Sequence, residues 1–354
     1  MKKSIILAVI MMVLTIGMAS TVSAYEKQNN LNVDDRYMYM VAPNFETTQL
    51  VRYDSKTGET KVLYSNGEIK GIKSVIVCGD KLLIEANKYA STTYGGYAGF
   101  VSSVNYIYSM NKDGSDLKVL VKGKDMIYHK GKIYYIKPKM TKIDGEKGSL
   151  YGSVYKMNPD GTNSKLVYKN KKVTRMYTDE KYLYVEKYSS DNMNKKYYRI
   201  SFKGKGAKKV DYAVYKNKKY NFYSIWEYYG IYPETEYTDH IKITNKKGEL
   251  VKNIKTNFFT VCGKYIYYNK SKDKTCSIYR LDTKTLKSKK VYSYTNKKLV
   301  SDSSCSALVF TNKLGKVIYI SGYCEEENGD FYDMICNCIN KKGTETEISK
   351  WFVS

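Results

Sequence analysis

Two segments of the chain decide its fold: NYIYSMNKDGSDLKVL at residues 105–120 and SVYKMNPDGTNSKLVY at residues 153–168. In each segment, a stretch in which apolar and polar residues alternate is followed by an Asp-Gly turn and then by a second strand flanked by lysine. This is the pattern of a β-hairpin. Weaker copies of this pattern begin at Leu50, Tyr197, Ile241, Ser277 and Met334. Seven copies of one supersecondary unit indicate a repeat architecture.

A second element, a turn followed by an alternating strand, precedes the copies, as in GKIYYI at residues 131–136 and GKYIYY at residues 263–268. Counted at the strand residue before each turn, successive copies are 38 to 57 residues apart. The residues counted are Tyr53, Met110, Met157, Ile200, Ile243, Leu281 and Cys338. This spacing holds four strands and their turns, which is the length of a propeller blade. We therefore predict an all-β fold, a seven-bladed β-propeller of four-stranded antiparallel blades, with six blades as the alternative.

The two ends of the chain complete this prediction. In the third repeat, strands a to d are expected near residues 126–128, 133–136, 154–157 and 165–168. The first repeat has no strand a before residues 34–40, and the chain ends on the apolar stretch Lys350-Trp351-Phe352-Val353. We expect this C-terminal strand to supply strand a of the first blade and to close the ring. Residues 34–354 then form a single propeller domain behind a flexible segment at 25–33.

The first 24 residues have the pattern of a secretory signal peptide. Lys2 and Lys3 form a basic start, residues 5–16 are mostly apolar, and Val22-Ser23-Ala24 supplies the small residues of a cleavage site. We expect cleavage near Ala24 and a secreted or cell-wall-associated protein. No later segment has the roughly 18 apolar residues that a transmembrane helix needs.

The pairing of GKxIYY with IYxMNxDGSxxKxL resembles the bacterial propeller domains that are grouped as a domain of unknown function and likened to the propeller of low-density-lipoprotein-receptor-related proteins. The chain is also similar to the wider YWTD and TolB-type propellers. The best matching positions are residues 106–114 with Lys118 and residues 154–161 with Lys165. The resemblance covers the expected mature chain and implies blade architecture. No intact YWTD tetrad is present, so receptor-type ligand binding is not implied, and these relatives often have six blades.

The chain carries a formal net charge of +25 at pH 7, and nearly all of the basic excess is lysine. A lysine-rich surface attracts polyanions diffusely, whereas bidentate phosphate recognition uses the planar fork of arginine. For an exported protein, an anionic wall polymer is a more accessible partner than nucleic acid. The alternative is that the lysine excess has no functional meaning, because AT-rich codons would produce the same composition. The expected turn side of strands c and d is rich in lysine: Lys203, Lys205, Lys208, Lys209, Lys246, Lys247, Lys287, Lys289, Lys290, Lys341 and Lys342.

The long connections between strands b and c are the candidate binding surface, because variable loops on one face of a repeat scaffold commonly bind partners. These connections are expected at residues 86–103, 137–150, 230–238 and 321–331. Exposed aromatic side chains there would suit stacking on sugars or peptide side chains. The candidate partner-binding residues are Tyr89, Tyr94, Tyr97, Phe100, Tyr232, Tyr237, Tyr323 and Phe331. The alternative is that these aromatic residues cover blade edges.

No motif predicts catalysis or a cofactor. The Asn-x-Asp-Gly segments at 111–114 and 158–161 lack the further oxygen ligands of a calcium loop, so we interpret them as hairpin turns. His129 and His240 are the two histidines, and they are too far apart in sequence to support a histidine metal site or a Ser-His-Asp centre. We predict no cofactor, no metal and no enzymatic activity, although paired carboxylates need only meet in space.

The seven cysteines show no regular spacing of a disulfide framework. We expect most of them to be buried as small apolar residues. One disulfide across a hairpin, between Cys324 and Cys336, is the alternative.

Three interpretations of function follow from the sequence. The first is an exported, non-enzymatic, monomeric propeller that binds a protein or glycan at the cell surface through the b–c loops. The second is a glycan hydrolase or lyase with carboxylates in the central channel. The third is a structural wall protein that its basic charge retains.

Overall fold

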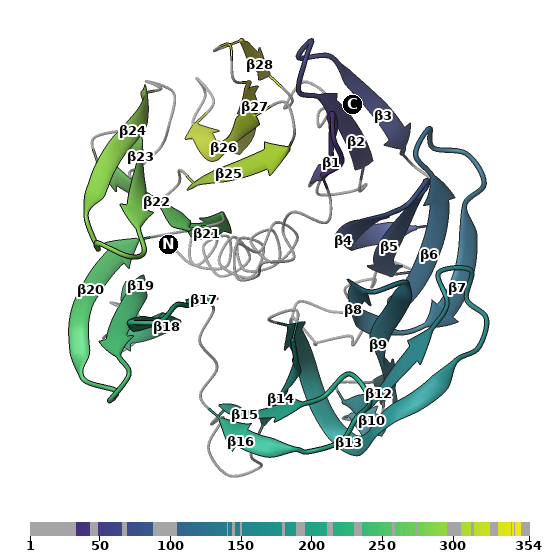
Figure 1. Cartoon of the computed structure of the whole chain (residues 1–354). Helices are drawn as coiled ribbons and strands as arrows, with labels where there is room; N and C mark the ends of the chain where they lie inside the picture. Colours follow the sequence, from purple (N-terminus) through teal and green to yellow (C-terminus); the bar gives the residue numbers. More distant parts are fainter. Residues whose placement is uncertain are drawn as a thin grey trace, which may run out of the picture. The chain divides into compact units, whose positions relative to one another are not determined.

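The computed structural model describes the chain in segments. These are residues 33–42, 49–65, 69–87, 105–139, 141–143, 146–148, 151–178, 181–188, 195–210, 215–229, 236–256, 259–262, 264–272, 275–295, 306–312, 315–325, 332–340, 342 and 344–347. Every regular element within them is a β-strand (Figure 1). None of the described elements is a helix long and apolar enough to cross a membrane. The predicted signal peptide and the predicted closing strand lie outside the described residues.

The described residues fall into two compact units. The first contains the described parts of Tyr39–Arg52 and Lys61–Asp211, and the second contains those of Ala24–Met38, Tyr53–Thr60 and Tyr212–Ser354. The first sheet has the order β1-β2-β3, with bounds Tyr37–Ala42, Gln49–Asp54 and Thr60–Tyr64.

Two larger sheets and one hairpin follow in the first unit. One sheet has the order β4-β5-β6-β7, with bounds Lys70–Cys78, Lys81–Asn87, Asn105–Asn111 and Lys118–Lys122. The other has the order β16-β15-β14-β13-β12-β9-β8; in chain order its bounds are Lys124–His129, Lys132–Pro138, Gly152–Met157, Lys165–Thr178, Leu183–Tyr188, Lys195–Ile200 and Lys208–Val210. The hairpin, β10 and β11 at Thr141–Ile143 and Glu146–Gly148, occupies a connection that the sequence predicted to be irregular.

The second unit contains three four-stranded sheets, each made of consecutive strands. Strands β17 to β20 have bounds Tyr215–Lys216, Tyr220–Tyr229, Glu236–Asn245 and Leu250–Thr256. Strands β21 to β24 have bounds Phe259–Cys262, Tyr265–Lys272, Thr275–Asp282 and Ser288–Thr295. Strands β25 to β28 have bounds Ser306–Asn312, Gly315–Glu325, Tyr332–Ile339 and Glu345–Glu347. Propeller blades are four-stranded sheets of this kind, and the repetition of such sheets along the chain confirms the all-β, propeller-type fold. Blade number and ring closure stay predictions.

The third and fourth repeats differ from the prediction of separate four-stranded blades, because they share one seven-stranded sheet. Strand β13 pairs with β12 at residues 165–168 and again at Val173, and it pairs with β14 from Val173 onward, with register shifts on both sides. It therefore serves as the last strand of one repeat and the first strand of the next. Residues 169–175 contain neither glycine nor proline, so nothing in this segment forces the chain to leave the extended conformation.

The Asp-Gly segments are hairpin turns, as predicted. Gly114 has a φ of 99° and its N–H donates to the carbonyl of Asn111 at 3.0 Å. The carboxylate of Asp113 accepts a hydrogen bond from the N–H of Ser115 at 2.9 Å. Gly161 repeats this geometry with a φ of 86°. Among the described residues no group of three or more His, Cys, Asp or Glu is arranged to hold a metal ion.

One side-chain bond explains why the two repeated motifs occur together. The ammonium group of Lys81, at the start of β5, donates to the side-chain oxygen of Asn111, at the end of β6. Lys132, at the start of β9, makes the equivalent bond to Asn158 after β12. The lysine that begins the strand of one motif thus binds the Asn that begins the turn of the other.

The hairpin turns also pack against a neighbouring repeat. An added Cβ on Gly114 would lie 2.6 Å from the carbonyl oxygen of Leu63 in β3, and one on Gly204 would lie 1.7 Å from that of Val167 in β13. Within the second unit, the Thr346 hydroxyl in β28 donates to the carbonyl of Gly58 at 3.0 Å. At Gly114 and Gly204, backbone of one repeat therefore approaches backbone of another, and only glycine leaves enough room there.

Apolar faces between successive hairpins form the core. In the first unit, Ile136 and Val154 of the third repeat pack with Leu183 and Ile200 of the fourth. In the second unit, an equivalent cluster joins the sheet β17–β20 to the sheet β21–β24. The buried faces follow the period-two alternation that the sequence showed, because side chains of a strand point alternately to its two faces.

The cysteines support burial over pairing. Cys78, Cys276 and Cys338 are buried free thiols, as expected. The register of β26 and β27 sets Cys324 opposite Asp333 and Cys336 opposite Ser321. Three residues of offset along a strand are about 10 Å, well beyond the Cα separation of a disulfide. The alternative of a Cys324–Cys336 disulfide is therefore wrong in this register.

Candidate anion-binding site

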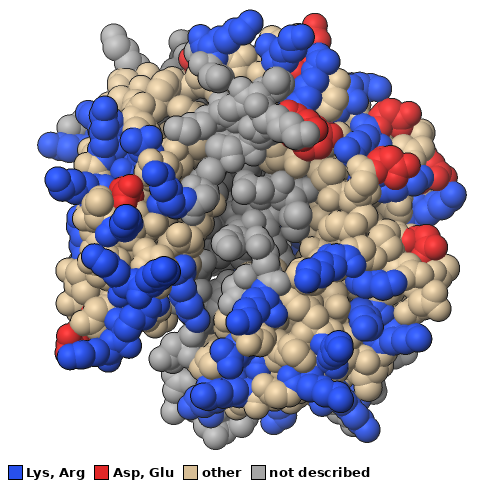
Figure 2. Space-filling model, in the orientation of Figure 1, with Lys and Arg blue, Asp and Glu red and all other residues tan. Residues whose placement is uncertain are grey.

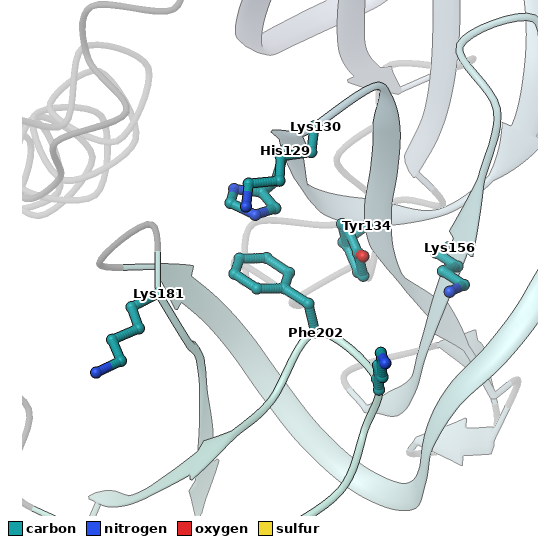
Figure 3. Close-up of a pocket in the computed structure, with 7 residues that line it drawn as sticks. His129, Lys130, Tyr134, Lys156, Lys181 and Phe202 are labelled. Atoms are coloured by element: carbon teal, nitrogen blue, oxygen red, sulfur yellow. The ribbon is translucent and has the colours of Figure 1, made fainter.

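A basic pocket opens at the turns of the seven-stranded sheet in the first unit (Figure 3). Its volume is about 610 Å³, within the range of small-molecule sites. The third repeat supplies side chains from the β8–β9 turn and from β9 and β12, and the fourth supplies them from the turns before β14 and after β15. The lining residues are His129, Lys130, Tyr134, Lys156, Lys181, Phe202 and Lys203.

The β8–β9 turn places two of these residues by an uncommon backbone conformation. His129 pairs with Lys132, so only Lys130 and Gly131 form the turn. Both have positive φ, 46° and 72°, as a two-residue type I′ hairpin requires. For lysine this left-handed backbone conformation is less favourable than for glycine by about 1 kcal/mol. The turn nevertheless keeps Lys130 beside His129 at the edge of the pocket (Figure 3).

Three rings form one aromatic wall of the pocket. The His129 and Phe202 rings are stacked, with centroids 3.7 Å apart and planes 3° apart. Tyr134 meets Phe202 edge to face at 5.1 Å. Burial raises the pKa of the Tyr134 hydroxyl, so it stays protonated and able to donate a hydrogen bond. We name His129, Tyr134 and Phe202 the aromatic wall.

Four lysines surround this wall, and no acidic side chain is among the seven lining residues. Lys130, Lys181 and Lys203 are exposed, and Lys156 is half-buried. Positive charges gathered around a concave surface raise the local concentration of anions. Figure 2 shows that Lys and Arg side chains also dominate the charged surface of the described residues on one face. The arrangement suits an anionic ligand.

A second cluster of charged groups lies within the first unit, away from the turns. Glu85 in β5 is 5% exposed and accepts a hydrogen bond from the Asn105 amide at 3.0 Å. Lys73 donates to the same Asn105 side chain at 2.9 Å. Burial, reinforced by nearby Asp125, raises the pKa of Glu85 from 4.5 to about 7, against the opposing effect of Lys73. The Glu85 carboxyl therefore keeps its proton up to near-neutral pH.

The same cluster extends to the neighbouring strands. Asp125 in β8 accepts a hydrogen bond from the backbone N–H of Met176 at 3.0 Å, and burial raises its pKa despite Lys124 and Arg175. Glu186 in β14 is fully buried and accepts a hydrogen bond from the Tyr177 hydroxyl at 3.0 Å. Protein donors satisfy these carboxyl groups, so the cluster primarily ties β5, β8, β13 and β14 together.

The predicted partner-binding residues fall mostly outside the described part of the chain. Two positions are described in their backbone, and both lie on strands, since β19 begins at Glu236 and β26 continues to Glu325. Tyr237 pairs with Tyr228, and Tyr323 pairs with Met334. The loops predicted at residues 230–238 and 321–331 are therefore longer than the connections in the structure, because parts of both ranges belong to strands. The residues outside the described segments are Tyr89, Tyr94, Tyr97, Phe100, Tyr232 and Phe331.

The lysines predicted on the c–d side are exposed wherever their burial is described, and Lys203 is one of the pocket residues. Sequence reasoning missed the aromatic wall as well as Lys130, Lys156 and Lys181. One signal was available: the fourth copy reads Ser201-Phe202-Lys203-Gly204, whereas the two clearest copies have Asn-x-Asp-Gly at the same turn. The site lies where the repeat departs from its own pattern.

Comparison with known proteins adds little to this description. No family model matches the chain. No curated protein matches it either.

Solved structures match at low identity. A candidate 6-phosphogluconolactonase from Bacteroides fragilis is 14% identical over 90% of this chain and 95% of its own, with a TM-score of 0.46. A chain of a nidogen/laminin complex is 12% identical over 74% and 94%, with a TM-score of 0.41. The Pyrococcus horikoshii acylaminoacyl peptidase is 15% identical over 84% of this chain but only 50% of its own, with a TM-score of 0.46. Similarities at these scores support no functional conclusion.

Proposed function

We propose that the chain is an exported, monomeric propeller of seven blades that acts as a binding module and not as an enzyme. Its ligand is an anionic polymer of the cell envelope, held in the basic pocket. The observation that carries this proposal is the gathering of four lysines around one cavity of about 610 Å³, with no acidic side chain among the lining residues that the structure describes. The loops predicted to bind a partner are largely outside the described residues, so the proposal rests on the pocket instead.

The pocket distinguishes this proposal from retention by diffuse charge alone. Surface lysines spread over a protein attract polyanions weakly, and salt screens that attraction. Lysines that converge on one cavity act on the same ligand group together. Recognition should therefore depend on which lysines are present and not only on how many.

Reversing two pocket charges should weaken binding strongly. In the double variant Lys181→Glu/Lys203→Glu, both changes fall on exposed turn residues, so the fold should be preserved. We expect binding of fluorescent polygalacturonate, measured by anisotropy, to weaken by at least about tenfold, or ~1.4 kcal/mol. Pull-down with isolated cell-wall fragments should show the same loss.

The matched control is Lys289→Glu/Lys290→Glu on β24, which changes the net charge equally at exposed residues that do not line the pocket. This control should bind within about twofold of the unmodified protein. An equal loss in both variants would support the interpretation of a wall protein retained by total charge and would sink the proposed pocket.

A further inference from the structure

We infer that the ligand of the basic pocket carries its negative charge on a sugar ring, so that the ring lies on the aromatic wall while its carboxylate or phosphate faces the lysines. This inference rests on the proposed function and narrows it to anionic glycans. Inorganic polyanions, which have charge but no ring, are excluded as the preferred ligand.

The first support is the chemistry of the wall. Phe202 and His129 are stacked face to face and are only partly buried. Tyr134 is buried except for a small fraction, and its hydroxyl is a hydrogen-bond donor. A sugar ring offers C–H groups to an aromatic face and hydroxyls to a polar tip, so a wall of this composition matches it. A chain of phosphates offers neither.

The second support is the position of Phe202 within the repeat. Among the described residues, four hairpin turns share the same backbone bond, in which a glycine N–H donates to the carbonyl three residues earlier; the donors are Gly114, Gly161, Gly204 and Gly248. In these turns the residue after the accepting one is Lys112, Pro159, Phe202 and Lys246, respectively. The scaffold therefore tolerates a polar residue or proline there. The phenylalanine is particular to the turn that lines the pocket.

The third support is the kind of cation present. The four basic residues of the pocket are all lysine. Lysine is a point charge without the planar fork with which arginine binds phosphate in a bidentate manner. Lysines set around a ring-binding wall can meet charges at several positions on a sugar, whereas a site for bidentate recognition of a single phosphate would favour arginine.

The test compares three probes on the full mature protein: an oligogalacturonate, an inorganic polyphosphate of similar charge, and a neutral maltooligosaccharide. We expect the unmodified protein to bind oligogalacturonate best and maltooligosaccharide not measurably. Phe202→Ala should weaken oligogalacturonate binding by about fivefold to tenfold and polyphosphate binding by less than about twofold. Isothermal titration calorimetry measures all three.

Phe202 also packs against the buried cluster of the sheet, so its removal could loosen the fold. Phe202→Lys is the second variant, because Lys112 and Lys246 occupy the equivalent turns. It should lose oligogalacturonate binding while polyphosphate binding is kept or strengthened. If either folded variant weakens the binding of oligogalacturonate and of polyphosphate equally, or weakens neither, the sugar ring is not recognised and the inference fails. The proposed function would fail separately, if Lys181→Glu/Lys203→Glu left both anions bound.

Discussion

Alanine at Gly204 should destabilise the protein by about 2–5 kcal/mol, one of the two largest effects that the structure leads us to expect. Gly204 has a φ of 78°, and an added Cβ would lie 1.7 Å from the carbonyl oxygen of Val167 and 2.7 Å from its carbonyl carbon. The obstacle is backbone of β13 and not a side chain that can rotate away. The turn or the strand must move, and both belong to the sheet that carries the pocket.

Gly206 in the same turn provides the control. Its φ is 69°, but nothing lies within 4 Å of an added Cβ. Gly206→Ala should therefore show only the conformational effect of a left-handed alanine, about 1–2 kcal/mol. Urea unfolding followed by tryptophan fluorescence and by circular dichroism measures both variants. Equal destabilisation by the two changes would show that the close approach of Gly204 to Val167 is not rigid.

The second large effect concerns pH. Because burial raises the folded-state pKa of Glu85 from 4.5 to about 7, the folded protein holds a proton that the unfolded chain releases between these values. Stability contributed by this group is full below pH 4.5 and is lost as pH rises to about 7. The loss is on the order of 3 kcal/mol, and the raised pKa of Asp125 acts in the same direction.

Replacing Glu85 with glutamine should remove this dependence. A glutamine oxygen can still accept the hydrogen bond from Asn105 but does not ionise. Glu85→Gln should leave stability at pH 4.5 nearly unchanged and raise it at pH 8. Glu249→Gln on an exposed turn controls for the loss of one negative charge. The explanation is wrong if Glu85→Gln is less stable than the unmodified protein at pH 8, since ionised Glu85 would then be stabilised by Lys73 more than burial penalises it.

Much of the fold could be predicted from local sequence, because a hairpin is specified by residues close together in the chain. Asn111 and Gly114 determine one turn, and the alternation around them determines which side chains are buried. The spacing of the repeats could not predict that two of them merge through β13. The hairpins on either side of this strand are separated in sequence by an ordinary blade length. It depends on the absence of a chain-breaking residue between Tyr168 and Val173.

The pocket could be predicted only in part. His129 and Phe202 lie on different hairpins, and nothing local to either residue indicates that their rings stack. The repeat pattern does set the turn before β9 and the turn before β14 at equivalent positions, so lysines at both could have been compared. Placing Phe202 against them requires knowing how closely one hairpin packs on the next, which the backbone approach at Gly204 determines.

The continuous strand β13 has a consequence for ligand binding. One half of the pocket comes from the repeat before this strand and the other half from the repeat after it, and both are held in one hydrogen-bonded sheet. The halves are thus preorganised, and a ligand that bridges them immobilises side chains but does not have to bring two separate hairpins together. Less conformational entropy is lost on binding than in a site between independent blades, so each contact with the ligand contributes more fully to affinity.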